Sequence, residues 1–234
     1  MISLKPLNKT YSIKMSHYHK NTDDSKREPL KIKVCGMNKN TVEVGALKPD
    51  YLGFIFWKPS KRNFNGKPVV LPHSIKKIGV FVDEQIAVIK ERIKTHQLLA
   101  VQLHGNESPE FCKALKQQLK GIEIIKVFSI KDEFNFEELR PFESVCDYYL
   151  FDTKGKLPGG NGFKFNWEVL KDYPSEKPFF LSGGIGLEDM DSIKEFMRQQ
   201  ESKYCHAIDV NSKFEIEPGL KDIGKLKDFI KNIK

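Results

Sequence analysis

The pattern of hydrophobic and polar positions changes at residue 31. Before that point the chain is polar and has no sustained periodicity, whereas from Lys31 onwards short β-branched and aromatic runs alternate with longer amphipathic segments. Apolar runs of this length, bounded by polar or glycine-containing segments, are typical of buried strands. They cover residues 31–36, 51–56, 77–82, 99–104, 122–128, 147–152, 178–183 and 206–210. The pattern therefore predicts eight strands.

Amphipathic segments of helical length separate these strands. Ile86, Ile89 and Ile93 recur at helical spacing within residues 84–96, and the segments 109–119, 187–198 and 220–233 behave likewise. The stretch 58–76 has the weakest signal, a long loop with at best a short helix at 72–77. Alternating strands and helices predict an α/β fold with a parallel sheet covered by helices. Eight such units favour closure into a single eight-stranded (β/α)8 TIM barrel over the alternative, an open doubly wound sheet.

The predicted domain organisation follows from the same change in pattern. Residues 31–234 form the barrel, since about 200–250 residues suit one such domain. Residues 1–30 are interpreted as a flexible polar N-terminal extension, because no apolar face is there to be buried. An upstream start codon ahead of a true start at Met15 explains this stretch equally well.

Charge and hydropathy narrow the possible partners. The net charge is +8, but residues 1–30 hold six basic and three acidic residues and residues 221–234 hold five and two, so the excess is mostly at the ends. A nucleic-acid binder concentrates basic residues on one folded face, and no such stripe is visible, so nucleic-acid binding is not expected. The surplus favours an anionic small substrate. The longest apolar run, 51–57, is far shorter than the roughly 20 residues of a membrane helix, so no membrane association is expected.

The four cysteines point to a reducing compartment. Cys35, Cys112, Cys146 and Cys205 are widely spaced and form no Cys-x-x-Cys pair. This spacing fits neither a disulfide framework nor a zinc site. Because the first thirty residues also lack a continuous apolar segment, no signal peptide is indicated and a cytoplasmic location is predicted.

Polar and small residues gather where the predicted strands end. In barrels of this kind the active site forms at the C-terminal ends of the strands and in the loops that follow them. Those positions read Cys35-Gly36, Pro59-Ser60-Lys61-Arg62, Asp83, His104-Gly105, Asp152-Thr153, Ser182-Gly183-Gly184 and Asn211-Ser212. The strand interiors stay largely apolar, so we expect the chemistry at this end.

Two glycine-rich loops follow late strands, at residues 159–162 and 182–184. Glycine lets the backbone approach a ligand and direct several N–H groups at it, and phosphate sites in barrels are commonly built from the last strands' loops. One such loop alone would be read as a tight turn. Two on successive strands favour a phosphorylated ligand.

Several polar side chains at the strand ends have two readings each. Cys35, taken alone, is more often a small buried hydrophobe than a reactive group. Asp152 ends a strongly apolar run, and burying its charge is costly, which favours a catalytic or hydrogen-bonded role. Asp209 has the same ambiguity and is interpreted as structural support. Arg62, taken alone, is interpreted as a solvent-exposed charged side chain in a loop. Gln102 and His104 are two residues apart on one strand and share a face, so they form either an internal hydrogen-bonding pair or a reacting pair.

Taken in order, these segments resemble phosphoribosylanthranilate isomerases. The similarity runs from about Lys31 to the C-terminus and leaves only the extension uncovered. Each glycine motif alone occurs in many phosphate-binding barrels, but the complete series of motifs in this order is far more specific to this family. The segments are Lys33-Val34-Cys35-Gly36, Gly53–Phe56 with Pro59–Arg62, Gly79–Val82, Val101–Glu107, Asp152-Thr153 with Gly159–Gly162 and Phe165–Trp167, Leu181–Gly184, and Pro218–Asp222.

The resemblance implies a (β/α)8 isomerase of tryptophan biosynthesis. Its reaction converts N-(5-phosphoribosyl)anthranilate to 1-(2-carboxyphenylamino)-1-deoxyribulose 5-phosphate by an Amadori rearrangement, without metal or organic cofactor, in a monomer or homodimer. By motif, Cys35 matches the general base, Asp152 the general acid, and Arg62 the residue that holds the anthranilate carboxylate. The phosphate site falls on Gly160, Gly162, Gly183, Gly184 and Ser212.

The rearrangement explains these residue types. A proton must be placed on the ribose ring oxygen and another removed from the adjacent carbon, so an acid and a base must flank the sugar. A thiol serves as base only as thiolate, so we expect neighbours that lower the pKa of Cys35 or pair with it.

One departure from the family pattern lies after the last strand. The family usually reads Asp-x-Ser-Ser-Gly-x-Glu, whereas this chain has Lys213 in place of that glycine and retains Ser212. Two rival functions fit the fold. An indole-3-glycerol phosphate synthase would require a catalytic lysine at a strand end. A non-catalytic sensor would bind the phosphoribosyl ligand without converting it to product.

Overall fold

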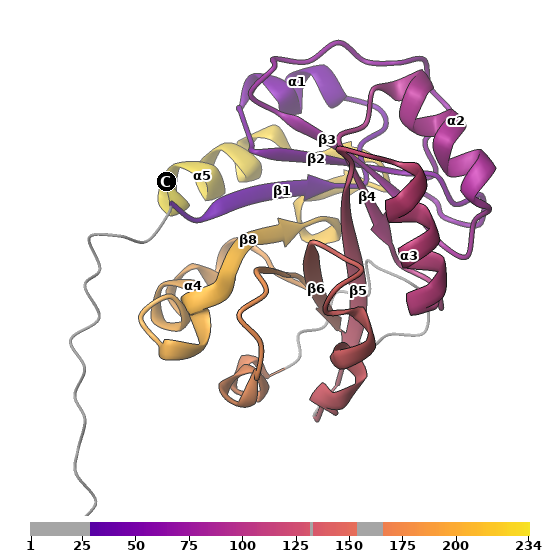
Figure 1. Cartoon of the computed structure of the whole chain (residues 1–234). Helices are drawn as coiled ribbons and strands as arrows, with labels where there is room; N and C mark the ends of the chain where they lie inside the picture. The colour runs from indigo at the N-terminus through magenta and orange to yellow at the C-terminus, as the bar shows by residue number, and fades with distance from the viewer. Residues whose placement is uncertain (1–28, 132, 154–165) are drawn as a thin grey trace, which may run out of the picture.

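Eight parallel strands close into a barrel in the computed structural model, which describes residues 29–131, 133–153 and 166–234 (Figure 1). The single closed barrel predicted from the eight apolar runs is confirmed, and the open sheet is excluded. The strands are β1 (Lys31–Cys35), β2 (Tyr51–Ile55), β3 (Lys76–Phe81), β4 (Ala100–Leu103), β5 (Glu123–Ile130), β6 (Tyr148–Thr153), β7 (Phe179–Leu181) and β8 (Cys205–Val210).

The ring is closed by β1, which pairs with β2 on one side and β8 on the other. Lys33 stands opposite Asp209 in one ladder, and Cys35 stands opposite Gly53 in the other. The first and last strands of the barrel therefore place their side chains together at one point of the interior.

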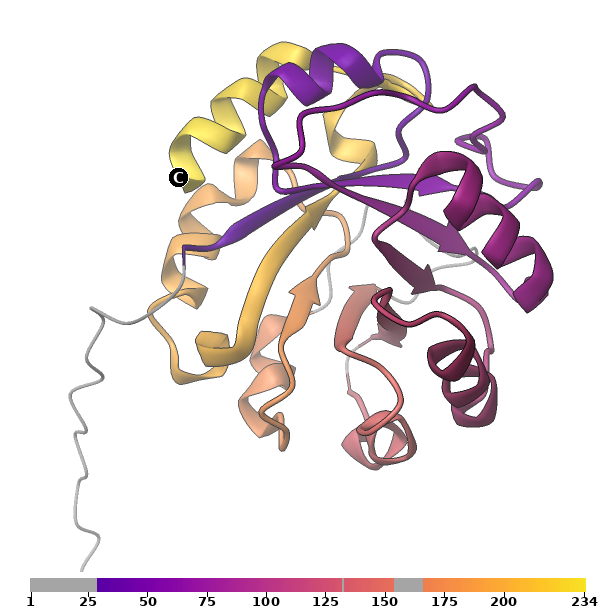
Figure 2. The same cartoon turned by 45° about the horizontal axis from the view of Figure 1, so that its top comes forward.

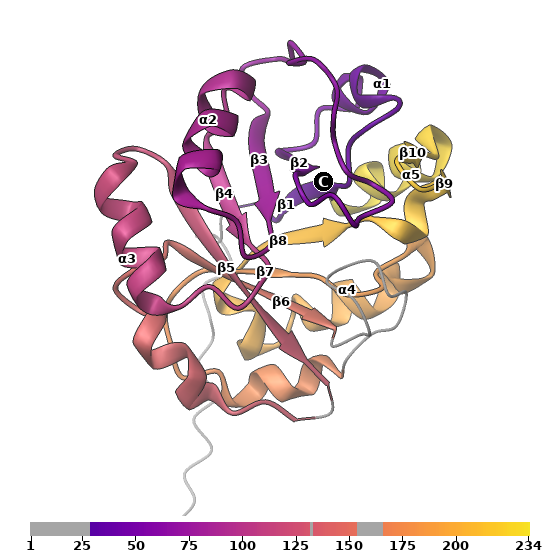
Figure 3. The ribbon, with the colours of Figure 1, turned by 90° about the vertical axis from the view of Figure 1, so that its right-hand side faces the viewer.

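Helices of two kinds surround the ring of strands (Figure 2). The α-helices are α1 (Thr41–Ala46), α2 (Ile86–His96), α3 (Pro109–Gln118), α4 (Met190–Phe196) and α5 (Ile223–Ile233). Shorter 3₁₀ helices are η2 (Phe136–Phe142), η3 (Trp167–Asp172), η4 (Leu187–Asp189), η5 (Gln200–Tyr204) and η6 (Ser212–Phe214). A small hairpin of β9 (Glu215–Glu217) and β10 (Leu220–Lys221) precedes α5 (Figure 3).

The helical layer differs from the prediction at 72–77 and at 220–233. The short helix expected at 72–77 is wrong, because Lys76 and Lys77 already belong to β3 and residues 56–75 contain no helix. Pairing with β2 takes these residues instead, since Lys76 and Lys77 stand opposite Tyr51 and Leu52 in the sheet. After β5, Pro141 lies inside the helical segment, which takes the tighter 3₁₀ form of η2. The segment predicted at 220–233 starts as β10 and becomes helical only at Ile223, where the Asp222 side chain caps α5.

The barrel interior has an apolar lower layer and a polar upper layer. Near the strand starts, inward side chains form one buried cluster of Tyr51, Ile78, Ala100, Ile125, Val127, Leu150, Phe180 and Ala207. Two residues further along three of these strands, the inward positions are Gln102, Asp152 and Asp209, all buried. Because side chains alternate along a strand, these polar groups point into the barrel towards its C-terminal end.

Candidate active site

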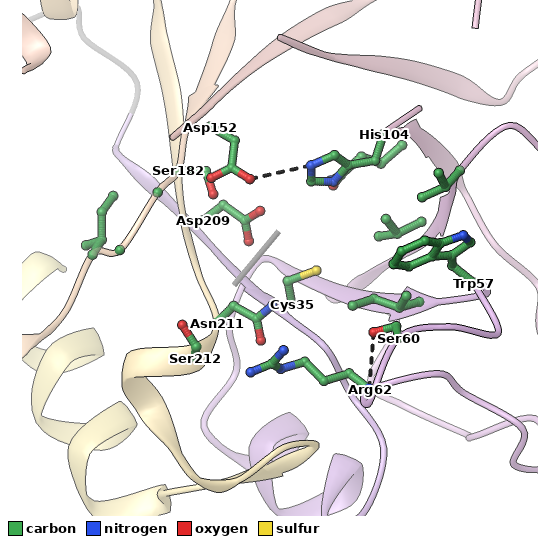
Figure 4. Close-up of a pocket in the computed structure, with 17 residues that line it drawn as sticks. Cys35, Trp57, Ser60, Arg62, His104, Asp152, Ser182, Asp209, Asn211 and Ser212 are labelled. Atoms are coloured by element: carbon green, nitrogen blue, oxygen red, sulfur yellow. Dashed lines mark hydrogen bonds and ion pairs between the residues drawn. The ribbon is translucent and has the colours of Figure 1, made fainter. Parts of the chain in front are cut away.

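A pocket opens at the C-terminal ends of the strands, where the sequence predicts the chemistry (Figure 4). Six of the predicted site residues line it: Cys35, Arg62, Asp152, Gly183, Gly184 and Ser212. Gly160 and Gly162 lie within 154–165, outside the described residues. The lining also includes Gln102, His104, Asp209 and Asn211. Residues far apart in the chain are thus brought to one site by the closed sheet.

Cys35 ends β1 and is only 5% exposed. Its thiol fits because the opposing residue on β2 is Gly53, where a Cβ would lie 2.8 Å from Cys35 Sγ. Such a distance is well inside van der Waals contact, so a larger residue at this position would displace the sulfur. The glycine therefore makes room for the thiol at the pocket wall.

The electrostatic surroundings of Cys35 pull in two directions. Burial raises the pKa of the thiol, the Asp209 carboxylate raises it further, and the ammonium groups of Lys33 and Lys221 lower it. Burial prevails and the pKa lies above its ordinary value. Lys33 and Lys221 are neighbours of the kind that the sequence analysis expects, but the lowered pKa that a thiolate base needs is not found.

Lys33 is the buried cation next to this thiol on the same strand. Its side chain is fully buried, and its Nζ donates to Asp209 Oδ2 at 2.6 Å and to Gln102 Oε1 at 2.7 Å. Burial would lower the pKa of Lys33, but the charges and hydrogen bonds of Asp209 and Cys35 together outweigh burial and the pKa is raised. A buried lysine held this way is a permanent positive charge beneath the pocket.

The polar contacts continue from Lys33 across the barrel to Asp152. Gln102 Nε2 lies 3.1 Å from His104 Nδ1, and His104 Nε2 lies 3.4 Å from Asp152 Oδ2. The backbone N–H of Thr153 donates to Asp152 Oδ1 at 2.9 Å. Gln102 and His104, which share a face of β4 as predicted, thereby link the lysine beside Cys35 to Asp152.

Arg62 reaches the pocket from the loop after β2 and is held by Glu215. Arg62 Nε donates to both carboxylate oxygens at 2.9 Å, and Nη2 donates to Oε2 at 2.6 Å. Glu215 also accepts from Lys221 Nζ at 2.9 Å and from the Gly219 N–H at 3.0 Å. The Arg62 side chain is 16% exposed, so it is an anchored pocket residue rather than the solvated charge read from the sequence.

The Glu215 carboxylate lies between two cations. Burial would raise the pKa of Glu215, but its hydrogen bond from Arg62 and the charge of Lys221 outweigh burial and the pKa is lowered. Sequence reasoning missed Glu215, Lys221 and Lys33 as parts of the site. A signal was available for Glu215, since it ends the stretch Asp209–Glu215 in which the Lys213 departure is found.

The glycine loop after β7 lies against the end of β6. Gly183 has φ +99°, and a Cβ there would be 2.2 Å from Thr153 Oγ1, so only glycine fits. Gly184 also has positive φ, at +64°. Together with Ser212 at the start of η6, these residues form a backbone-rich corner of the pocket.

Lys213 is accommodated without backbone strain. It lies within η6 and is not among the described non-glycine residues with positive φ. Its Nζ forms an ion pair with Glu188 Oε1 at 3.1 Å on the adjoining η4. The side chain is therefore engaged at the surface, and the exchange of glycine for lysine leaves Ser212 in the pocket lining.

Two further observations bear on ligands and membranes. Over the described ranges, no group of three or more His, Cys, Asp or Glu side chains is arranged to hold a metal ion. No helix in the same ranges has the length and apolar character needed to span a membrane.

Comparison with known proteins gives a consistent picture. A family model described as N-(5'phosphoribosyl)anthranilate (PRA) isomerase matches residues 31–232. An N-(5'-phosphoribosyl)anthranilate isomerase of Parabacteroides distasonis is 45% identical over 210 residues, 86% of this chain and 92% of that protein.

Two solved structures have the same fold. One is phosphoribosyl anthranilate isomerase in complex with reduced 1-(o-carboxyphenylamino)-1-deoxyribulose 5-phosphate, with a TM-score of 0.70, 28% identity, and coverage of 87% of this chain and 98% of that one. The other shows monomers generated from the dimeric phosphoribosylanthranilate isomerase of Thermotoga maritima, with a TM-score of 0.69, 28% identity and the same coverage.

Proposed function

The chain belongs to the N-(5'-phosphoribosyl)anthranilate isomerase family, and we propose that Cys35 is its general base and Asp152 its general acid. It is an isomerase of tryptophan biosynthesis that converts N-(5-phosphoribosyl)anthranilate to 1-(2-carboxyphenylamino)-1-deoxyribulose 5-phosphate. The observation that carries the assignment is that both side chains line one pocket from different strands. Strands β7 and β8 separate β1 from β6, which leaves room for a sugar between the two groups.

Two proton transfers make up the proposed mechanism. Asp152 gives a proton to the ribose ring oxygen, the C–O bond at the anomeric carbon breaks, and the nitrogen lone pair forms a Schiff base. Cys35 thiolate then takes the proton from the neighbouring carbon, and the electron pair released forms an enolamine that tautomerises to the ketone. Each step needs its group in hydrogen-bonding reach of the sugar, which fits their position in the pocket lining.

The raised pKa of Cys35 shapes the expected rate profile. The thiolate is the form that acts as base, and the Lys33 ammonium stabilises that form against the effect of burial. Because the same rate also needs Asp152 in its protonated form, kcat/KM should rise with pH only below the lower of the two pKa values and fall only above the higher one.

The two anionic groups of the substrate each need their own binding groups in the pocket. We propose that Arg62 binds the anthranilate carboxylate, because a guanidinium held by Glu215 through Nε and Nη2 still has N–H groups outside that ion pair. Gly183, Gly184 and Ser212 would bind the phosphate through backbone N–H and hydroxyl groups. Gly160 and Gly162 complete this proposal from the loop outside the described residues.

Quaternary state and compartment are proposed on narrower grounds. We propose a monomer or homodimer, since the related Thermotoga maritima protein is dimeric and its monomers have the same fold. We also propose a cytoplasmic location. The four cysteines are free, which fits a reducing compartment.

The acid and base assignment is tested by pH profiles of kcat/KM. Cys35→Ser, Cys35→Ala and Asp152→Asn should each lower kcat by 10²-fold or more, on the order of a general acid or base contribution. Cys205→Ser, at the start of β8, is the matched control and should keep the wild-type profile. Binding of the reduced product analogue should change much less in all four variants. If Cys35→Ser turns over like wild type with the same pH profile, the base assignment is wrong and His104 becomes the next candidate.

A further inference from the structure

The two oxygens of Asp209 have different environments. Oδ2 accepts the short hydrogen bond from Lys33 Nζ at 2.6 Å. Oδ1 is buried and has no hydrogen-bond partner among the described residues. The residue as a whole is 6% exposed and lines the pocket. An acceptor oxygen of a carboxylate is rarely left buried without a donor, because its desolvation is then uncompensated.

The place of Asp209 in the pocket limits what the missing donor can be. Asp209 lies beside β1 in the barrel ladder, opposite Lys33, and Figure 4 shows it between Cys35 and Asp152. The proposed base and acid flank the sugar, so Asp209 faces the sugar and not the two ends of the substrate. Both ends are anionic, and a carboxylate oxygen would repel either of them.

We infer that Asp209 Oδ1 accepts a hydrogen bond from a hydroxyl group of the ribose portion of the substrate. The inference rests on the proposed function, which places the sugar between Cys35 and Asp152. Lys33 holds the other oxygen, so the acceptor is fixed in position before the substrate arrives. Asp209 is thus a substrate-binding residue as well as the structural support that its place in a strand suggests.

The fixed orientation makes Asp209→Asn a sharp probe. Lys33 can only donate, so the amide oxygen must turn to Lys33 and the NH₂ group must face the sugar. The variant therefore replaces a charged acceptor in the pocket by a neutral donor at nearly constant shape. Asp147→Asn is the matched control, because Asp147 also accepts from a lysine, Lys116 at 2.8 Å, but lies at the start of β6, away from the pocket.

The experiment measures dissociation constants by calorimetry for the reduced product analogue and for analogues that each lack one of its hydroxyl groups. In wild type and in Asp147→Asn, one deoxy analogue should bind about tenfold or more weaker than the parent, as for one lost charge-assisted hydrogen bond. In Asp209→Asn, the parent analogue should bind about tenfold or more weaker than it binds to wild type. The ratio of dissociation constants between that same deoxy analogue and the parent should then shrink to less than about threefold.

If Asp209→Asn does not fold, the double variant Lys33→Met/Asp209→Leu removes the ion pair without leaving a buried charge. In this double variant, the fall in affinity between the parent analogue and the same deoxy analogue should also shrink to less than about threefold. Equal losses for every deoxy analogue in wild type and variant would overturn the inference alone. Absence of analogue binding to wild type would overturn the proposed pocket and the inference together, whereas an active Cys35→Ser with an unchanged pH profile would overturn only the base assignment.

Discussion

Replacing Glu215 by glutamine removes the negative charge that pairs with the partly buried Arg62 and the buried Lys221. Arg62 donates three hydrogen bonds to this carboxylate and Lys221 donates a fourth. The Glu215 side chain is 4% exposed and that of Lys221 is fully buried. In Glu215→Gln the amide oxygen can still accept from one cation, but its NH₂ group faces the other.

The size of the effect follows from burial. A hydrogen bond to a charged group contributes about 1.5–3 kcal/mol, and removing one partner of a buried ion pair costs about 3–5 kcal/mol. Because glutamine keeps the shape and one acceptor, we expect a loss of about 3 kcal/mol in the free energy of unfolding. At roughly 2–4 °C per kcal/mol for a domain of this size, Tm should fall by roughly 6–12 °C.

The loss should also depend on pH. The pKa of Glu215 is lowered in the folded protein from an ordinary value of 4.5. A group with a lowered pKa stabilises the fold above its unfolded pKa, and this contribution is lost as pH falls through the folded pKa. The difference between wild type and Glu215→Gln should therefore be largest at neutral pH and shrink below about pH 4.5.

Urea unfolding followed by tryptophan fluorescence at pH 7 and at pH 3.5 measures both effects. Glu123→Gln is the matched control, because Glu123 pairs with Lys76 in a half-exposed ion pair with side chains 30% and 40% exposed. Such pairs contribute about 0–1 kcal/mol. A loss in Glu215→Gln no larger than in Glu123→Gln would refute the view that this carboxylate holds Arg62 and Lys221 in place.

Two further variants test the carboxylate site and the N-terminal stretch. Arg62→Lys should raise KM for the substrate by about tenfold or more, because an ammonium cannot reproduce the paired N–H groups of a guanidinium; an unchanged KM in steady-state kinetics would assign the carboxylate to another residue. Deletion of residues 1–28 should leave Tm and kcat close to wild type, since that stretch has no apolar face to bury. A large fall of either quantity would show that it packs on the barrel.

The strands and the residues at their ends could be predicted because each is indicated by a short pattern of neighbouring residues in the sequence. Each strand is a short apolar run, and Cys35 and Asp152 stand directly at the ends of two of them. Once a closed parallel barrel is assumed, strand ends meet, and the site follows from sequence order.

The ion pairs of the site could not be predicted in this way. A lysine within a strand is usually read as solvent-exposed, and Lys33 is buried only because it meets Asp209 across the closing seam of the barrel. Arg62, in the loop after β2, and Glu215, the first residue of β9, are likewise distant in the chain and meet only in the folded protein. Such ion-pair partners are determined by the tertiary structure, and the residues that neighbour them in the sequence do not indicate them.

The seam between β1 and β8 also has a consequence for biosynthesis on the ribosome. Lys33 and its partner Asp209 are 176 residues apart in the chain. At synthesis rates of about 5–20 residues per second, the lysine precedes its counter-ion by roughly 9–35 s. During that interval, burial of Lys33 at its native position would leave its charge without this counter-ion, which is costly. The seam between β1 and β8 therefore gains its ion pair only when the last strand of the barrel is added.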